Sequence, residues 1–143
     1  NTPSMICVED FLDVLNWTRE IGGLEELIRR SKDNLNIIKD WVCLSSWVDF
    51  LCEDLNNLSN TSICLKLIDP KLNSQSLETK NIIEKNIIKL LEENNVAFDI
   101  GSYRSAPPGL RIWGGPTVEN DDIKKLLPWL DWAYHKSLSD LDI

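Results

Sequence analysis

The sequence has very little histidine and no closely spaced cysteine pair. Its 143 residues include one histidine, His135, and four cysteines, none of them in a Cys-x-x-Cys arrangement. Tetrahedral metal sites draw their ligands from clustered cysteines and histidines, so we expect no zinc or other metal site. A disulfide framework is not expected either, because a chain of this length can fold around its own core. We expect buried, reduced thiols at Cys7, Cys43, Cys52 and Cys64.

A long uncharged apolar run, a basic stripe and a signal peptide are also missing. No segment approaches the roughly 18 apolar residues that a membrane helix needs. The formal net charge is −8, and the basic residues are scattered apart from the pairs at 29–30 and 124–125. This charge argues against nucleic acid or an anionic membrane as a partner. The N-terminal stretch Asn1-Thr2-Pro3-Ser4-Met5 has no basic n-region, so we expect a cytoplasmic protein.

The apolar pattern predicts both helices and strands. Helical spacing of apolar residues predicts helices at 8–22, 24–42 and 76–93 and a last one after Thr117, bent or split at Pro128. Alternation and short apolar runs predict strands at 47–53, 61–68, 96–100 and 110–113. The order of these elements predicts an α/β fold of the α+β type, with a sheet of about four strands and helices packed on it.

The same pattern divides the chain into two parts. Residues 1–45 are predicted to form a helical segment that leads into one compact α/β domain at 46–143. The apolar side chains on the inner faces of these elements should be largely buried: Ile63, Leu65, Leu67, Ile83, Ile87, Leu90 and Trp113.

No set of residues in this sequence is a convincing catalytic group. The most informative segment is Asp99 to Trp113, in which Arg104 and Arg111 flank a stiff Pro-Pro-Gly loop. Arg111 lies within an otherwise apolar strand. Such an arginine either faces solvent on an edge strand or is held to bind an anion. The guanidinium group is suited to the second role, because its planar fork grips a carboxylate through two hydrogen bonds.

Several segments resemble one enzyme family. They are G-S-Y-R-S-A-P-P-G-L-R-I-W-G-G-P-T-V-E followed by L-L-P-W-L-D-W-A, the opening N-T-P-S-M-I-C-V-E-D-F, W-V-D-F-L-C-E-D and S-N-T-S-I-C-L-K. In this order they resemble the C-terminal region of phosphoserine aminotransferases. The resemblance implies the small C-terminal domain of the aspartate aminotransferase fold. It also implies a homodimeric pyridoxal-phosphate enzyme that exchanges an amino group between glutamate and 3-phosphohydroxypyruvate in serine biosynthesis.

The resemblance assigns roles to five residues. Arg111 matches the arginine that binds the substrate α-carboxylate. Arg104, with Tyr103 before it, lies where a better-known branch of the family has a His-Arg pair for the substrate phosphate. Here Tyr103 replaces the histidine and the spacing to Arg111 is one residue longer, which leaves Tyr103 the weaker candidate. Asn1 and Thr2 match the pair that reaches the cofactor phosphate of the second subunit.

The resemblance places the catalytic lysine, which holds the cofactor, before the Asn-Thr-Pro segment. We therefore expect no catalytic residue in these 143 residues, no cofactor bound to them alone and no activity without the large domain and a second subunit. Two alternatives remain. One is the small domain of a related aminotransferase of the alanine/serine–glyoxylate type, which Arg111 would serve equally well. The other is an α/β binding domain without catalysis.

Overall fold

The computed structural model describes residues 4–143. Four α-helices and a three-stranded sheet alternate along this part of the chain. In order, the elements are α1 (Met5–Ile21), α2 (Leu24–Leu44), β1 (Val48–Phe50), β2 (Ser62–Leu67), α3 (Leu77–Glu93), β3 (Gly109–Trp113) and α4 (Asn120–Asp140). Short 3-10 turns at Leu55–Asn57 and Pro70–Leu72 flank β2. The mixed α/β class is confirmed.

The sheet is antiparallel, with the strand order β1-β2-β3. Ile63 on β2 lies opposite Ile112 on β3, and Cys64 lies opposite Arg111. Successive side chains of a strand point to opposite faces. The face that carries Ile63 and Ile112 is therefore buried, while Arg111 and its neighbours occupy the open face.

The predicted fourth strand at 96–100 is wrong. This segment forms no ladder, and the one isolated bridge lies just after it, between Gly101 and Leu110. Asp99 has a φ of 53°, in the left-handed region that interrupts extended backbone. The amide of Arg111 still donates to the carbonyl of Ile100 at 2.8 Å, so the segment runs beside β3 without becoming part of the sheet.

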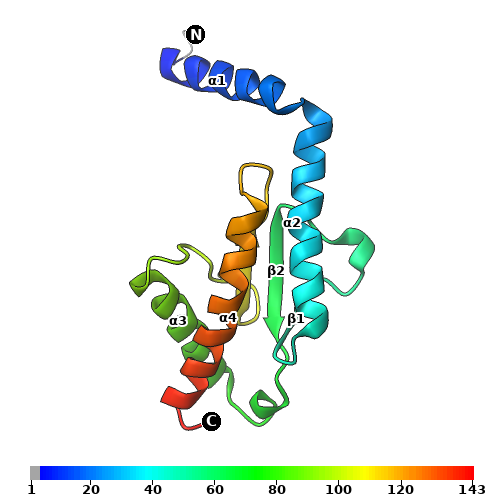
Figure 1. Cartoon of the computed structure of the whole chain (residues 1–143). Coiled ribbons are helices and arrows are strands. Elements are labelled where there is room, and N and C mark those ends of the chain that lie inside the picture. The colour runs from blue at the N-terminus through cyan, green and yellow to red at the C-terminus, as the bar shows by residue number, and fades with distance from the viewer. Residues whose placement is uncertain (1–3) are drawn as a thin grey trace.

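The helices α2, α3 and α4 cover the buried face of the sheet, and α4 packs between the other two (Figure 1). Their contact stripes follow the predicted helical spacing, with Ile38 on α2, Ile83 and Ile87 on α3, and Leu130 on α4 fully buried. Each belongs to one continuous core that also takes in Ile63 and the other inward side chains of the sheet. Within residues 4–143, no helix combines the length and the apolar character needed to cross a membrane.

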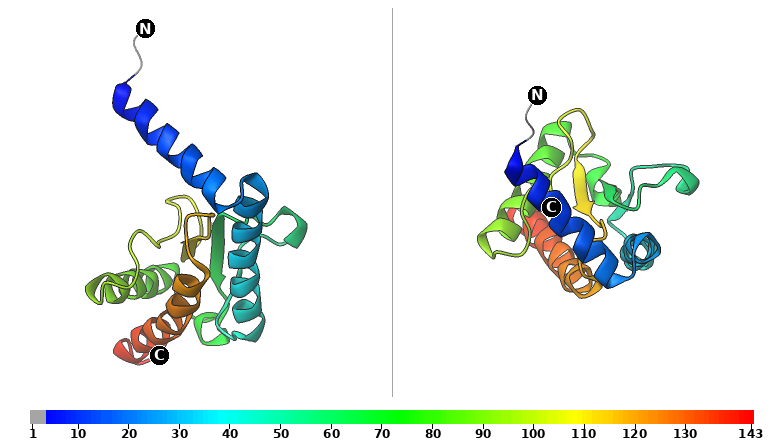
Figure 2. Two further views of the ribbon diagram at one scale, coloured as in Figure 1. Left: turned by 45° about the horizontal axis from the view of Figure 1, so that its top comes forward. Right: turned by 90° about the horizontal axis from the view of Figure 1, so that it is seen from above.

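The first helix stands apart from this core. Gly22, with a φ of 118°, ends α1 in the left-handed conformation, and the chain then turns into α2. Figures 1 and 2 show α1 projecting from the body. It has no buried residue, and several of its apolar side chains are exposed, among them Met5, Ile6 and Phe11.

The last helix has a different N-cap from the predicted one and is not split at its proline. Glu119, instead of Thr117, occupies the N-cap position of α4. The helix runs through Pro128 without being split, although proline removes one backbone hydrogen bond. Buried side chains on both sides of the proline, Leu127 and Leu130, keep the helix on the core.

The predicted burial is correct for most residues and wrong for Trp113. Ile63, Leu65, Ile83 and Ile87 are buried, whereas Leu67 and Leu90 are half-buried. Trp113 is 56% exposed, because it shares the open face of β3 with Arg111. The cysteines are free, as expected, but they are not buried: Cys7 and Cys43 are exposed and Cys52 and Cys64 are half-buried.

Candidate functional site

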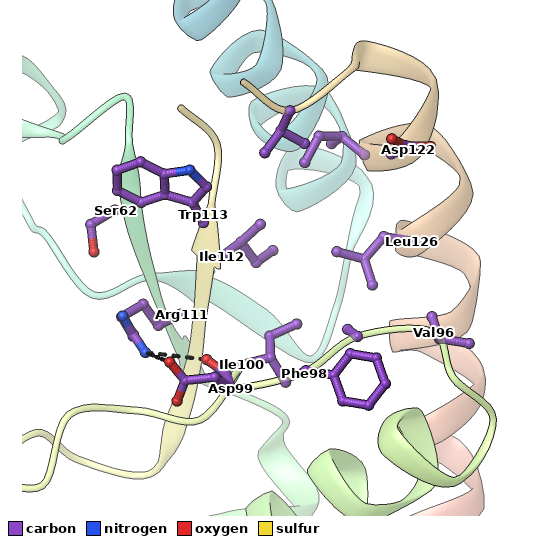
Figure 3. A pocket seen from close by; sticks show the side chains of 13 residues that line it. Ser62, Val96, Phe98, Asp99, Ile100, Arg111, Ile112, Trp113, Asp122 and Leu126 are labelled. Carbon is purple, nitrogen blue, oxygen red and sulfur yellow. Dashed lines mark hydrogen bonds and ion pairs between the residues drawn. The ribbon is translucent and has the colours of Figure 1, made fainter. Parts of the chain in front are cut away.

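A groove of about 550 Å³ opens between β3, the 96–100 segment and the first turns of α4. Figure 3 shows apolar side chains, among them Phe98 and Ile112, along much of its wall. The polar groups of the wall come from Ser62, Asp99, Arg111 and Asp122. We call this cavity the β3–α4 groove. It joins an apolar surface to one guanidinium group, which is an arrangement suited to a small organic anion.

Arg111 is the main cationic group of the groove. Its Nη2 atom donates to the Oδ2 atom of Asp99 at 2.9 Å and to the backbone carbonyl of Asp99 at 3.2 Å. The Nε atom is buried and has no hydrogen-bond partner among the described residues. A buried donor without a partner is costly, so this N–H offers a strong position for an acceptor. The arginine thus already holds one carboxylate and has a further donor to offer.

Local backbone geometry explains how Arg111 is held. Gly109 at the start of β3 lies so close to β2 that a Cβ atom there would come within 2.0 Å of the carbonyl oxygen of Leu65. Glycine therefore allows the tight pairing of β2 and β3 that carries Arg111. The left-handed turn at Asp99 then brings its carboxylate across the guanidinium, as Figure 3 shows.

Tyr103 lies directly against Arg111. The guanidinium carbon is 4.8 Å from the centre of the Tyr103 ring, within the range of a cation–π contact. The Tyr103 hydroxyl is also 3.2 Å from the Ser62 hydroxyl, which ties the loop back to β2. The hydrogen bond to Asp99, and to a smaller extent Tyr103, raises the pKa of Arg111 above its usual value, while burial acts in the opposite direction. The group therefore remains a cation at physiological pH.

The other predicted site residues are placed differently. Arg104 is exposed in a turn, is not part of the groove wall and forms no ion pair within residues 4–143. The structure thus brings Tyr103 to Arg111 but leaves Arg104 outside the groove. Asn1 and Thr2 lie outside the described residues. Among residues 4–143, no three His, Cys, Asp or Glu side chains are grouped to hold a metal ion.

Comparison with known proteins identifies the relatives of this chain. The phosphoserine aminotransferase of Methanosarcina barkeri is 46% identical over 137 residues, and that of Methanosarcina mazei is 44% identical over 134 residues. Each alignment covers 94% of this chain. The resemblance to phosphoserine aminotransferases is confirmed. The chain spans about a third of the length of these relatives, 34% in each case.

Solved structures agree on the fold of this phosphoserine aminotransferase-like chain. The enzyme from Bacillus circulans subsp. alkalophilus superimposes with a TM-score of 0.75 at 24% identity, over 95% of this chain and 34% of its own. A structure concerned with radiation damage of the Schiff base in phosphoserine aminotransferase gives the same TM-score at 17% identity. No protein-family model matches the chain. The solved structures show the fold, and the two Methanosarcina relatives favour the C-terminal part of a phosphoserine aminotransferase over the two alternatives from the sequence.

Two contacts in and beside the groove were not predicted from the sequence. Asp99 was assigned to a strand, and its pairing with Arg111 depends on a left-handed backbone that no pattern indicated; its only signal is that Asp and Gly are poor strand formers. Glu84 on α3 accepts hydrogen bonds from the amide and the hydroxyl of Ser102, at 2.9 and 2.6 Å. Ser102 directly precedes Tyr103, so Glu84 anchors the loop that carries the aromatic partner of Arg111.

Proposed function

We propose that this chain is the small C-terminal domain of a phosphoserine aminotransferase and that it binds the anionic groups of the substrates. In this proposal Arg111 grips the α-carboxylate of glutamate and of phosphoserine, beside the ring of Tyr103. Arg104 contributes to the phosphate of phosphoserine and 3-phosphohydroxypyruvate. The observation that carries the assignment of Arg111 is its buried, unpartnered Nε atom beside an Nη2 atom that already holds a carboxylate.

The proposal extends to the whole enzyme. The chain would work with a large domain and a second subunit, as a cytoplasmic homodimer in serine biosynthesis, with Asn1 and Thr2 near the cofactor phosphate. Pyridoxal phosphate, when bound, supplies the electron sink for amino transfer. No lysine lines the β3–α4 groove, so the described residues there can bind and orient an anion but offer no amine for cofactor attachment.

The physical role of the two arginines is orientation as well as affinity. A substrate that carries a carboxylate and a phosphate is fixed in position when separate cations hold its two ends. Arginine suits the carboxylate because its fork forms two hydrogen bonds, whereas the phosphate can also be held by a point charge.

The test compares variants of the full-length enzyme by kcat/KM in both half-reactions. Arg111→Ala should lower kcat/KM for every substrate, because each substrate carries an α-carboxylate. The decrease should correspond to a loss of about 2–5 kcal/mol in transition-state stabilisation. Arg111→Lys should not restore it, since lysine cannot form the two-bond grip. Arg19→Ala, which removes an exposed cation on α1, is the matched control and should have little effect.

Arg104 tests the choice of substrate. Arg104→Ala should impair phosphoserine and 3-phosphohydroxypyruvate much more than glutamate, and Arg104→Lys should recover part of the loss. An equal loss for glutamate and phosphoserine would show that Arg104 does not bind phosphate. Unchanged kinetics in Arg111→Ala would remove the basis for assigning the groove to the substrate.

A further inference from the structure

Asp99 occupies the one nitrogen of Arg111 that every two-bond carboxylate grip requires. A guanidinium has two edges that can bind both oxygens of a carboxylate, one formed by Nε and Nη2 and the other by Nη1 and Nη2. Both edges include Nη2. In the structure, Nη2 donates to the side chain and to the backbone carbonyl of Asp99, at 2.9 and 3.2 Å. A substrate carboxylate therefore meets an internal carboxylate at this atom.

The contact is built so that the side chain of Asp99 can leave. That side chain is 91% exposed, against 25% for Arg111, and exposed ion pairs are held only weakly. The main chain around it does not need to move, because the carbonyl of the next residue, Ile100, accepts a hydrogen bond of 2.8 Å from the Arg111 amide. Rotation of this one exposed side chain frees one N–H of Nη2 for a substrate oxygen, while the bond from Nη2 to the Asp99 carbonyl can remain.

The guanidinium keeps other support when Asp99 leaves. The ring of Tyr103 lies 4.8 Å from the guanidinium carbon, and the hydroxyl of Tyr103 is fixed near Ser62 at 3.2 Å. Arg111 itself is anchored in β3, opposite Cys64 on β2. Its position thus depends on the strand and on an aromatic face, and Asp99 is not needed to keep it in the groove.

We propose that Asp99 is an internal competitor that an incoming carboxylate displaces from Arg111, so that Asp99 sets the affinity of the groove for carboxylates. This inference rests on the proposed role of Arg111. Asp99 weakens ground-state binding of each substrate through the same atom and leaves the chemical step alone. Replacing Asp99 should therefore lower KM and tighten the binding of carboxylates that do not react, while kcat stays unchanged.

The test uses the full-length enzyme with Asp99→Asn and Asp99→Gly, two residues that tolerate the left-handed backbone at this position. Asp142→Asn is the matched control, because Asp142 is also exposed and also has a positive φ, of 55°. This substitution removes the same charge at a position away from the groove. The measurements are KM and kcat for glutamate, and the inhibition constant of succinate, which has two carboxylates but no amino group to exchange.

Both Asp99 variants should lower the KM for glutamate and the inhibition constant of succinate by about two- to fivefold, the range set by a weak exposed ion pair. The control should change neither. Asp99→Asn should no longer lower either constant when it is made in an Arg111→Gln background, because the guanidinium for which the two carboxylates compete is then absent.

Two results would overturn the inference. A higher KM and weaker succinate binding in the Asp99 variants would mean that Asp99 holds Arg111 in a productive position, and unchanged values would mean that it has no part in binding. A different result would show that Arg111 does not bind the substrate carboxylate at all. In that case Arg111→Gln alone would leave the KM for glutamate and the inhibition constant of succinate unchanged.

Discussion

Asn34 on α2 and Asn120 in the first turn of α4 are joined by a hydrogen bond of 2.8 Å between their side-chain amides. Asn34 is completely buried, and its Nδ2 atom also lies within 3.3 Å of the carbonyl oxygens of Gly114 and Gly115 and 2.9 Å from that of Val118. One side chain thus ties α2 to the whole turn between β3 and α4. This turn follows β3, the strand that carries Arg111, so the network also holds one end of the groove.

Replacing the side-chain amide of Asn34 should destabilise the fold strongly. Asn34→Asp keeps the shape but puts carboxylate oxygens against backbone carbonyls, so the free energy of unfolding should fall by about 3 kcal/mol or more. Urea unfolding measures the change. Asn36→Asp, two residues along the same helix and exposed, is the control and should cost little. Equal losses in the two variants would contradict the role assigned to Asn34.

Gly109 should not tolerate even one added methyl group. In Gly109→Ala the new Cβ atom would lie 2.0 Å from the carbonyl oxygen of Leu65, in backbone that is paired on both strands. We expect a loss of about 3 kcal/mol in urea unfolding, together with loss of carboxylate binding through Arg111. Gly101→Ala is the comparison, because its Cβ would come close only to the end of the flexible Ile88 side chain, at 2.9 Å, with the Glu84 carboxylate at an ordinary contact distance of 3.8 Å. Gly101→Ala should lose clearly less free energy of unfolding than Gly109→Ala. A loss in Gly109→Ala as small as that in Gly101→Ala would contradict the tight pairing of the strands.

Stability should depend on Tyr134 at high pH. Tyr134 is completely buried, stacks on Trp47 at 4.2 Å and donates a hydrogen bond of 2.7 Å to Asp69. Burial first, and then the Asp69 carboxylate, raise the pKa of its phenol above the usual value. Because the folded pKa is the higher one, the stabilisation is complete below about pH 10 and decreases as the pH rises further.

The comparison is between the wild type and Tyr134→Phe, unfolded with urea at a series of pH values. At neutral pH the variant should be less stable by about 1–3 kcal/mol, because it lacks the hydrogen bond to Asp69. Above about pH 10 this difference should narrow, since only the wild type then has an ionised tyrosine in the unfolded chain that must take up a proton on folding. A difference that stays constant up to pH 11 would show that the phenol is not perturbed.

The 143 residues produced alone should fold without catalysing transamination. Their core joins three helices to the sheet, which is enough apolar burial for an independent domain of this size. The groove has no lysine to attach pyridoxal phosphate. We therefore expect a cooperative unfolding transition by circular dichroism, and no glutamate-dependent turnover when the cofactor is added. Measurable turnover by the purified chain would contradict the second expectation.

The elements that follow from local periodicity were predicted well. The stripes of α2 and α3 repeat every three or four residues, and β2 alternates strictly around Ile63 and Leu65, so each element can be recognised from its own residues. Arg111 could be singled out for the same reason, because a charge among apolar strand residues is conspicuous. Its place on the open face also follows from the buried neighbours Leu110 and Ile112.

The errors occur where long-range geometry decides. The 96–100 segment has the composition of a strand, but the left-handed backbone at Asp99 removes it from the sheet. Trp113 was expected inside because it is apolar, yet the register that places it opposite Ser62 puts it on the open face. Apolar character predicts burial on average, whereas the strand register decides it for a single side chain.

The sequence by itself determined the helical and extended segments, the mixed α/β class and the arginine that an anion could bind, because these depend on residue type and spacing over a few neighbours. Only the tertiary structure decided which groups meet. Asp99 reaches Arg111 across 12 positions, and Asn34 reaches Gly114 across 80. Such contacts require a particular backbone turn and a particular packing of α2 against α4, and neither leaves a periodic signal in the chain.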